Sequence, residues 1–108
     1  MDRFEFQRQC VRNVGEEKVL NVGCHIDGGG IKYVGPNVFN CDVEVQVGWQ
    51  YQPDYLFDAR FRWPFDDESV GLVVLGDILE HMFDHEILDI LKEARRVSRR
   101  LCITVPQA

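Results

Sequence analysis

The chain has no long hydrophobic run, no excess of positive charge and no CxxC cysteine pair. Its longest apolar run, at residues 70–75, is far shorter than the roughly 20 residues that a transmembrane helix needs. The first five residues lack the apolar core of a signal peptide. We therefore expect a cytoplasmic protein that has no membrane partner.

The charge balance is acidic, with a formal net charge of −6. A chain of this sign is a poor match for the phosphate backbone of a nucleic acid, so we expect no nucleic-acid partner. The cysteines are Cys10, Cys24, Cys41 and Cys102, and without a signal peptide they are expected to be reduced. A zinc site built from Cys24, His25, Cys41 and His81 is conceivable. Their spacings match no zinc template, so we expect no metal.

What the chain does have is the composition of an ordinary globular protein, with 45% hydrophobic and 28% charged residues. Its 108 residues predict a single domain spanning residues 1–108. A domain near this size buries most of its apolar surface on folding.

Helical and strand patterns alternate along the chain. The expected helices are residues 2–14 and 85–99, and the expected strands are residues 18–22, 38–43, 55–58, 70–75 and 101–105. This alternation predicts an α/β protein with a Rossmann-like parallel sheet of about five strands and flanking helices. In such sheets ligands bind beyond the carboxyl ends of the strands, where the strand order reverses. Candidate site residues therefore directly follow the strands.

The helix over residues 85–99 has the clearest amphipathic pattern. Its apolar stripe consists of Ile87, Leu91, Ala94 and Val97, widened by Leu88 and Ile90. Its last turn and the residues that follow carry Arg95, Arg96, Arg99 and Arg100. Cations suit the negative end of the helix dipole, so we expect a solvated basic end and not a phosphate site.

Three motifs follow one another in the second half of the chain. Residues 58–70 read DARFRWPFDDESV, residues 77–81 read DILEH, and residues 103–106 read ITVP. In this order they resemble the second half of class I S-adenosylmethionine-dependent methyltransferases. That family carries D-A-x-x-L-P-F-x-D-x-S-F-D before strand four, E-x-L-E-H after it, and I-x-x-P at strand five. The resemblance implies a truncated methyltransferase core with S-adenosyl-L-methionine as cofactor.

The resemblance also implies roles for individual residues. The implied cofactor-binding set is Gly23, Cys24, Asp42, Asp58, Ala59 and Asp77. Asp42, with Glu44 as a backup, would accept hydrogen bonds from the ribose hydroxyls, and Asp58 and Ala59 would meet the adenine. Asp77 would bind the methionine amino group or cap the next turn. His81 is the candidate general base, since imidazole titrates near neutral pH. Trp63 and Phe65 are expected to pack the turn against the sheet.

The glycine-rich loop departs from the family pattern. Family members carry an acid before a G-x-G-x-G run, whereas this chain has Asn21 in place of the acid. His25 and Asp27 stand where the second and third glycines would be, and Gly28–30 come a few residues late. The crossover from Gly23 leaves room for one or two helical turns around residues 31–34.

Two functions remain open from the sequence. The first is methyl transfer to an unidentified acceptor, and the alternative is a noncatalytic module that binds a ligand or assembles on the same fold. The family's terminal hairpin, which lies beside strand five, is missing here. We therefore expect residues 101–105 to form an open, apolar sheet edge. This predicts a homo-oligomer through the strand-five edge, or a fragment of a longer chain whose missing segment covers that edge.

Overall fold

The computed structural model describes residues 2–23, 36–43 and 52–106. In chain order the elements are α1 (Arg3–Asn13), β1 (Val19–Val22), β2 (Val38–Asp42), β3 (Tyr55–Leu56), β4 (Leu72–Gly76), the 3-10 helix η1 (Leu79–His81), α2 (Asp84–Val97) and β5 (Leu101–Thr104). The predictions made for Cys24, His25, Asp27, Gly28–30, residues 31–34 and Glu44 lie outside the described residues.

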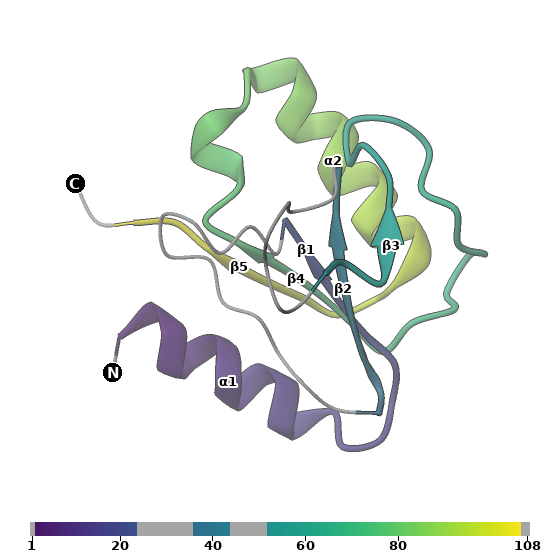
Figure 1. The fold of residues 1–108 in the computed structure, drawn as a ribbon. Helices are drawn as coiled ribbons and strands as arrows, with labels where there is room; N and C mark the ends of the chain where they lie inside the picture. The colour runs from purple at the N-terminus through teal and green to yellow at the C-terminus, as the bar shows by residue number, and fades with distance from the viewer. Residues whose placement is uncertain (1, 24–35, 44–51, 107–108) are drawn as a thin grey trace.

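The five strands form one sheet in the order β3-β2-β1-β4-β5, and every neighbouring pair is parallel. Helix α1 lies on one side of this sheet and α2 on the other (Figure 1). The predicted α/β, Rossmann-like class is therefore confirmed. The strand order reverses at β1, which has β2 on one side and β4 on the other, so a ligand is expected above the carboxyl ends of these strands.

The two faces of the sheet carry separate apolar clusters. Strands β1 and β4 alternate between the faces and are buried on both, as a central parallel strand requires. One cluster joins the sheet to α2 and includes Leu20, Val22, Val73, Leu75, Ile90, Ala94 and Val97. The other lies on the α1 side and includes Val14, Val19, Val38, Leu72, Val74 and Cys102. Trp63 and Phe65 belong to the α2 side, so their predicted packing role is confirmed.

Helix α1 begins and ends where the sequence predicts. The Asp2 side chain accepts a hydrogen bond from the Glu5 backbone N–H at 2.8 Å, and Gly15 adopts a positive φ of 62° after the helix. The helix is held to the sheet by Gln7, whose buried amide donates to the Thr104 hydroxyl at 2.5 Å. A Cβ on Gly76 would lie 2.8 Å from the Gln7 amide nitrogen, so a glycine in β4 permits this close approach.

One residue of the predicted apolar stripe of α2 is misplaced. Ile90, Ala94 and Val97 are fully buried, but Leu88 is 62% exposed. Two positions along a helix correspond to a rotation of about 200°, so Leu88 and Ile90 point to nearly opposite sides. Widening the stripe to include both was therefore wrong for Leu88.

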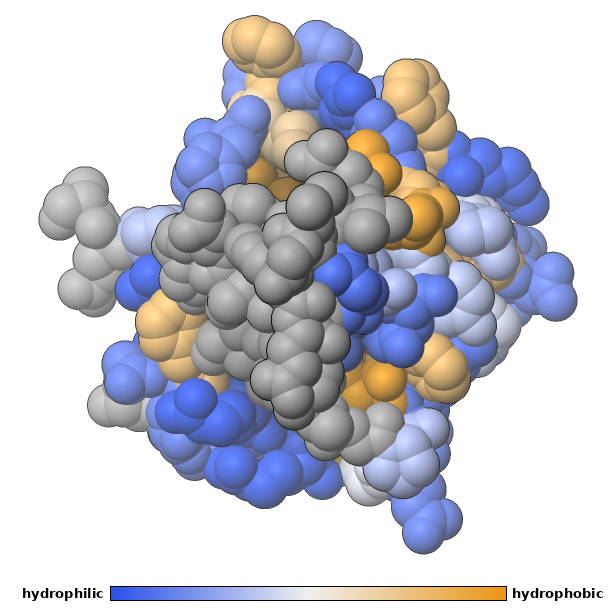
Figure 2. Space-filling model, in the orientation of Figure 1, coloured by the Kyte–Doolittle hydropathy of each residue, from blue (hydrophilic) through white to orange (hydrophobic). Residues whose placement is uncertain are grey.

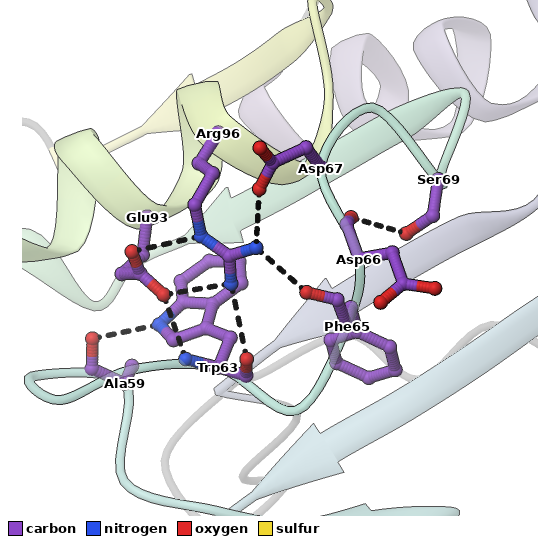
Figure 3. Close-up of polar contacts among 8 residues, drawn as sticks. All are labelled: Ala59, Trp63, Phe65, Asp66, Asp67, Ser69, Glu93 and Arg96. Atoms are coloured by element: carbon purple, nitrogen blue, oxygen red, sulfur yellow. Dashed lines mark hydrogen bonds and ion pairs between the residues drawn. The ribbon is translucent and has the colours of Figure 1, made fainter.

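The prediction of a solvated basic end on α2 was wrong for Arg96. Its side chain is only 16% exposed and forms an ion pair with Glu93 at 2.9 Å. It also donates to the backbone carbonyls of Trp63 and Phe65, at 3.0 and 2.7 Å, and to the Asp67 carboxylate (Figure 3). Glu93 in turn accepts from the Trp63 backbone N–H at 2.7 Å. These contacts fasten the turn at residues 63–67 to α2, which sequence spacing alone did not indicate.

Among the described atoms visible in Figure 2, most of the surface is hydrophilic, and the hydrophobic residues lie in small patches. Among the described residues, no helix has both the length and the apolar character needed to cross a membrane.

Candidate functional site

A pocket of about 840 Å³ lies at the carboxyl ends of the strands. Its walls come from β1, β2 and β4, from the segment after β3, from η1 and the start of α2, and from Arg3 of α1. The volume is within the usual range for small-molecule sites, about 300 to 1,000 Å³. Six of the predicted site residues line it, namely Gly23, Asp42, Asp58, Ala59, Asp77 and His81. The seventh, Cys24, lies outside the described residues.

Gly23 directly follows β1 and has a backbone conformation that other residues rarely adopt. Its φ is +74°, and a Cβ at this position would lie 3.1 Å from the Ile78 side chain. Both facts favour glycine here. Its backbone N–H donates to the Cys41 carbonyl at 2.9 Å, which holds the ends of β1 and β2 together.

Asn21, which stands where the family has an acid, is buried in the sheet. Its amide donates to the Asn40 side-chain oxygen at 2.9 Å, across the parallel pair that joins β1 to β2. A carboxylate opposite Asn40 would have to be buried without the charge partner that such burial demands. Asn21 thus serves the strand pairing, and it does not line the pocket.

Asp42 is the last residue of β2 and has one unsatisfied carboxylate oxygen. Its Oδ1 accepts a hydrogen bond from the Val43 backbone N–H at 2.7 Å. Its Oδ2 is buried and has no hydrogen-bond partner, the only side-chain atom of this kind in residues 2–23, 36–43 and 52–106. An orphaned buried acceptor is costly, and a ligand donor such as a hydroxyl group would satisfy it.

Asp58 is held by a neighbour that the motif did not assign to the site. The Arg60 guanidinium donates to both carboxylate oxygens of Asp58, at 2.9 and 2.6 Å, and reaches Glu86 of α2 at 3.0 Å. These hydrogen bonds lower the pKa of Asp58 and raise that of Arg60. The pKa of Glu86 is also lowered, first by the Phe83 backbone N–H and then by Arg60. The three side chains therefore stay charged at neutral pH.

Asp77 lies just beyond β4 and has a backbone φ of +57°, which is unusual for a residue other than glycine. Its carboxylate forms an ion pair with Arg3 of α1 at 2.8 Å, and only 15% of the Asp77 side chain is exposed. The N-cap position of η1 is Ile78, and no side-chain hydrogen bond caps this helix, so the option that Asp77 caps the next turn was wrong. The ion pair fixes the carboxylate at the pocket.

His81 lines the pocket from its rim. Its side chain is 74% exposed, and its Nε2 lies 3.3 Å from the Glu80 carboxylate. The neighbouring Phe83 is also highly exposed, which makes this side of the pocket open to solvent. A molecule in solution can therefore reach His81.

We compared the chain with protein-family models, curated proteins and solved structures. None of them matches.

Two kinds of site find no support in the described part of the chain. No group of three or more His, Cys, Asp or Glu side chains there is placed to hold a metal ion. Cys41 and Cys102 are buried, and burial together with the hydrogen bond that the Cys102 thiol donates to Cys10 raises the pKa of Cys102 to about 12. A thiol that stays protonated is a poor nucleophile.

Sequence reasoning missed two cations, Arg3 and Arg60. Arg60 directly follows the Asp58-Ala59 pair, so its proximity to Asp58 was open to prediction. Arg3 is 74 residues from Asp77, and nothing in the local sequence of either residue indicates the pair. Only the docking of α1 beside β4 and β5 brings them together.

Proposed function

We propose that the pocket binds S-adenosyl-L-methionine and that the domain transfers its methyl group to an acceptor. The observation that carries this proposal is the buried, unpartnered Oδ2 of Asp42 at the end of β2. The resemblance assigns to Asp42 the ribose hydroxyls, and a hydroxyl donor is what this oxygen lacks. Bound S-adenosylmethionine would supply an electrophilic methyl carbon, so the protein's main task is positioning.

The other pocket residues have roles that fit the same ligand. Asp58 and Ala59 lie next to one another on the wall formed after β3, where the resemblance puts the adenine. Asp77 offers a carboxylate to an ammonium group. His81, open to solvent at the rim, is the candidate to take a proton from the acceptor.

Two observations favour the alternative, a noncatalytic ligand-binding module. Arg60 occupies both carboxylate oxygens of Asp58, so an adenine amino group would have to compete with a bidentate ion pair. His81 is paired with Glu80 and largely exposed, so the structure does not orient it toward a reacting atom. On this alternative the pocket binds its ligand without chemistry.

The first test is binding of S-adenosylhomocysteine, the demethylated cofactor, measured by calorimetry and thermal unfolding. Ligand at about 100 times its dissociation constant adds roughly 2.7 kcal/mol to the free energy of unfolding. For a domain of this size that raises the melting temperature by at least about 8 °C. If millimolar S-adenosylhomocysteine leaves the melting temperature unchanged, both methyl transfer from this cofactor and noncatalytic binding of it are contradicted. Binding without methyl transfer to any of a broad panel of acceptors would favour the noncatalytic module.

A further inference from the structure

The ion pair between Arg3 and Asp77 leaves both terminal nitrogens of the guanidinium available. Arg3 donates through Nε alone, at 2.8 and 3.1 Å to the two oxygens of Asp77. Its two terminal nitrogens make no hydrogen bond within the described part of the chain. The side chain is 35% exposed and lines the pocket, where it also lies 4.4 Å from the centre of the Phe4 ring.

A guanidinium whose two terminal nitrogens make no hydrogen bond can bind an anion. Its two terminal N–H₂ groups form a planar fork that matches the two oxygens of a carboxylate. The Asp77 carboxylate fixes the fork from behind through Nε, so little side-chain entropy remains to be lost on binding. Arg60, the other arginine of the pocket, is already bound to Asp58 and Glu86.

Arg3 and Asp77 together present a positive and a negative group to one side of the pocket. The ligand group that complements both is a zwitterion, with a carboxylate for Arg3 and an ammonium for Asp77. We propose that Arg3 of α1 is a specificity residue that recognises the α-carboxylate of an amino-acid end of the ligand. This inference rests on the proposed function, because it names the part of S-adenosylmethionine that Arg3 contacts.

The inference gives the N-terminal helix a role in binding. α1 would serve both to cover one face of the sheet and to carry Arg3 into the site. The docking contact between Gln7 and Thr104 lies one turn further along the helix, so it holds Arg3 in place beside Asp77. Thr104 also lies 3.4 Å from Asp77, which ties the end of β5 to the same pair.

The test compares two ligands that differ only in the carboxylate. S-Adenosylhomocysteine has it, and S-adenosyl-3-thiopropylamine lacks it while retaining the ammonium group and the nucleoside. For the wild-type protein we expect calorimetry to show about 10- to 100-fold tighter binding of S-adenosylhomocysteine, as for the loss of a charged hydrogen bond. Arg3→Ala should reduce this preference to less than about threefold, mainly by weakening S-adenosylhomocysteine binding.

Arg12→Ala is the matched control, because Arg12 lies on the same helix, pairs with Glu5 and does not line the pocket. It should retain the wild-type preference. The wild-type comparison needs no variant, so it can overturn the proposal even if Arg3→Ala fails to fold. Equal binding of the two ligands by wild type would overturn the role of Arg3 and leave the proposed function standing. An unchanged preference in folded Arg3→Ala would also overturn it. If neither ligand binds at millimolar concentration, the proposed function fails and takes this inference with it.

Discussion

One carboxylate oxygen of Asp42 destabilises the fold and is at the same time available to bind a ligand. Its Oδ1 is satisfied by the Val43 backbone, whereas its buried Oδ2 has no donor. A buried acceptor without a partner costs about 1 to 3 kcal/mol, and a fold does not gain from retaining it. Such a residue is expected where binding requires it, since functional sites commonly sacrifice stability.

Substituting Asp42 should therefore separate binding from stability. For Asp42→Ala we expect the affinity for S-adenosylhomocysteine to fall by about 10- to 100-fold, because a charged acceptor of the ligand hydroxyls is lost. The free energy of unfolding should stay within about 1 kcal/mol of wild type or rise, since removal of the orphaned oxygen offsets the lost hydrogen bond from Val43.

Calorimetry gives the affinities and urea unfolding gives the stabilities. Asp66→Ala is the control, because Asp66 is an exposed acid that does not line the pocket. Unchanged ligand affinity in Asp42→Ala would remove Asp42 from the site. A stability loss of several kcal/mol would show that its role is structural.

At the scale of elements, the turn at residues 63–67 depends on α2. Arg96 and Glu93 of α2 bind two backbone carbonyls, one backbone N–H and one carboxylate of this turn (Figure 3). The turn follows the Asp58-Ala59 wall of the pocket, and Trp63 donates from its indole to the Ala59 carbonyl at 2.8 Å. The helix thus positions a wall of the pocket without contributing Arg96 or Glu93 to it.

This network should make folding sensitive to acid. Hydrogen bonds from Arg96 lower the pKa of Glu93, and burial opposes them only in part. A carboxyl group with a lowered pKa in the folded state stabilises the fold when it is ionised. This contribution is complete well above about pH 4.5 and is lost as the pH falls through the lower, folded-state pKa.

We expect Glu93→Gln to be less stable than wild type by about 1.5 to 3 kcal/mol at pH 7, because charged hydrogen bonds are lost. The difference should shrink as the pH falls from 5 to 3. Urea unfolding at a series of pH values measures it. Glu16→Gln removes the same charge from an exposed residue and should show neither effect. A constant difference at every pH would contradict the role of ionised Glu93.

At the scale of the whole molecule, the two edges of the sheet differ. β3 has only two residues, and a short edge strand offers little to a partner. β5 is longer and apolar, and Ile103 is 40% exposed there, with Val105 just beyond it at 51%. The predicted position of this strand at the edge is confirmed, whereas association through it stays a prediction.

We expect the chain to form a homodimer in which β5 pairs with β5 of a second copy. Sedimentation at micromolar concentration should show the dimer for wild type, and Ile103→Glu should shift it to the monomer by placing a charge at the paired edge. Leu88→Glu, on an exposed leucine of α2, should leave the dimer intact. A monomeric wild type, or a dimer that Leu88→Glu also dissociates, would refute the β5 interface.

Much of the fold could be predicted from the sequence, because the signals for it are local. The apolar run before Gly76 indicates a strand buried on both faces, the 3.6-residue period of Ile87, Leu91 and Ala94 indicates an amphipathic helix, and Asp2 marks a helix start. Alternating elements of this kind form a parallel sheet, and in a parallel sheet the strand ends meet at one edge. That is why Gly23, Asp42, Asp58 and Asp77 were predicted near one another and do line one pocket.

The partners of these residues were decided only by the tertiary structure. Arg3 reaches Asp77 because α1 docks on the face beside β4 and β5, and Arg96 reaches the turn at residues 63–67 because α2 packs on the other face. Both pairs join residues far apart in the sequence, so no spacing encodes them. The same packing leaves Oδ2 of Asp42 buried without a partner and turns Leu88 outward. The sequence alone thus determined which residues end the strands, and three-dimensional packing decided which charges are already paired and which remain available to a ligand.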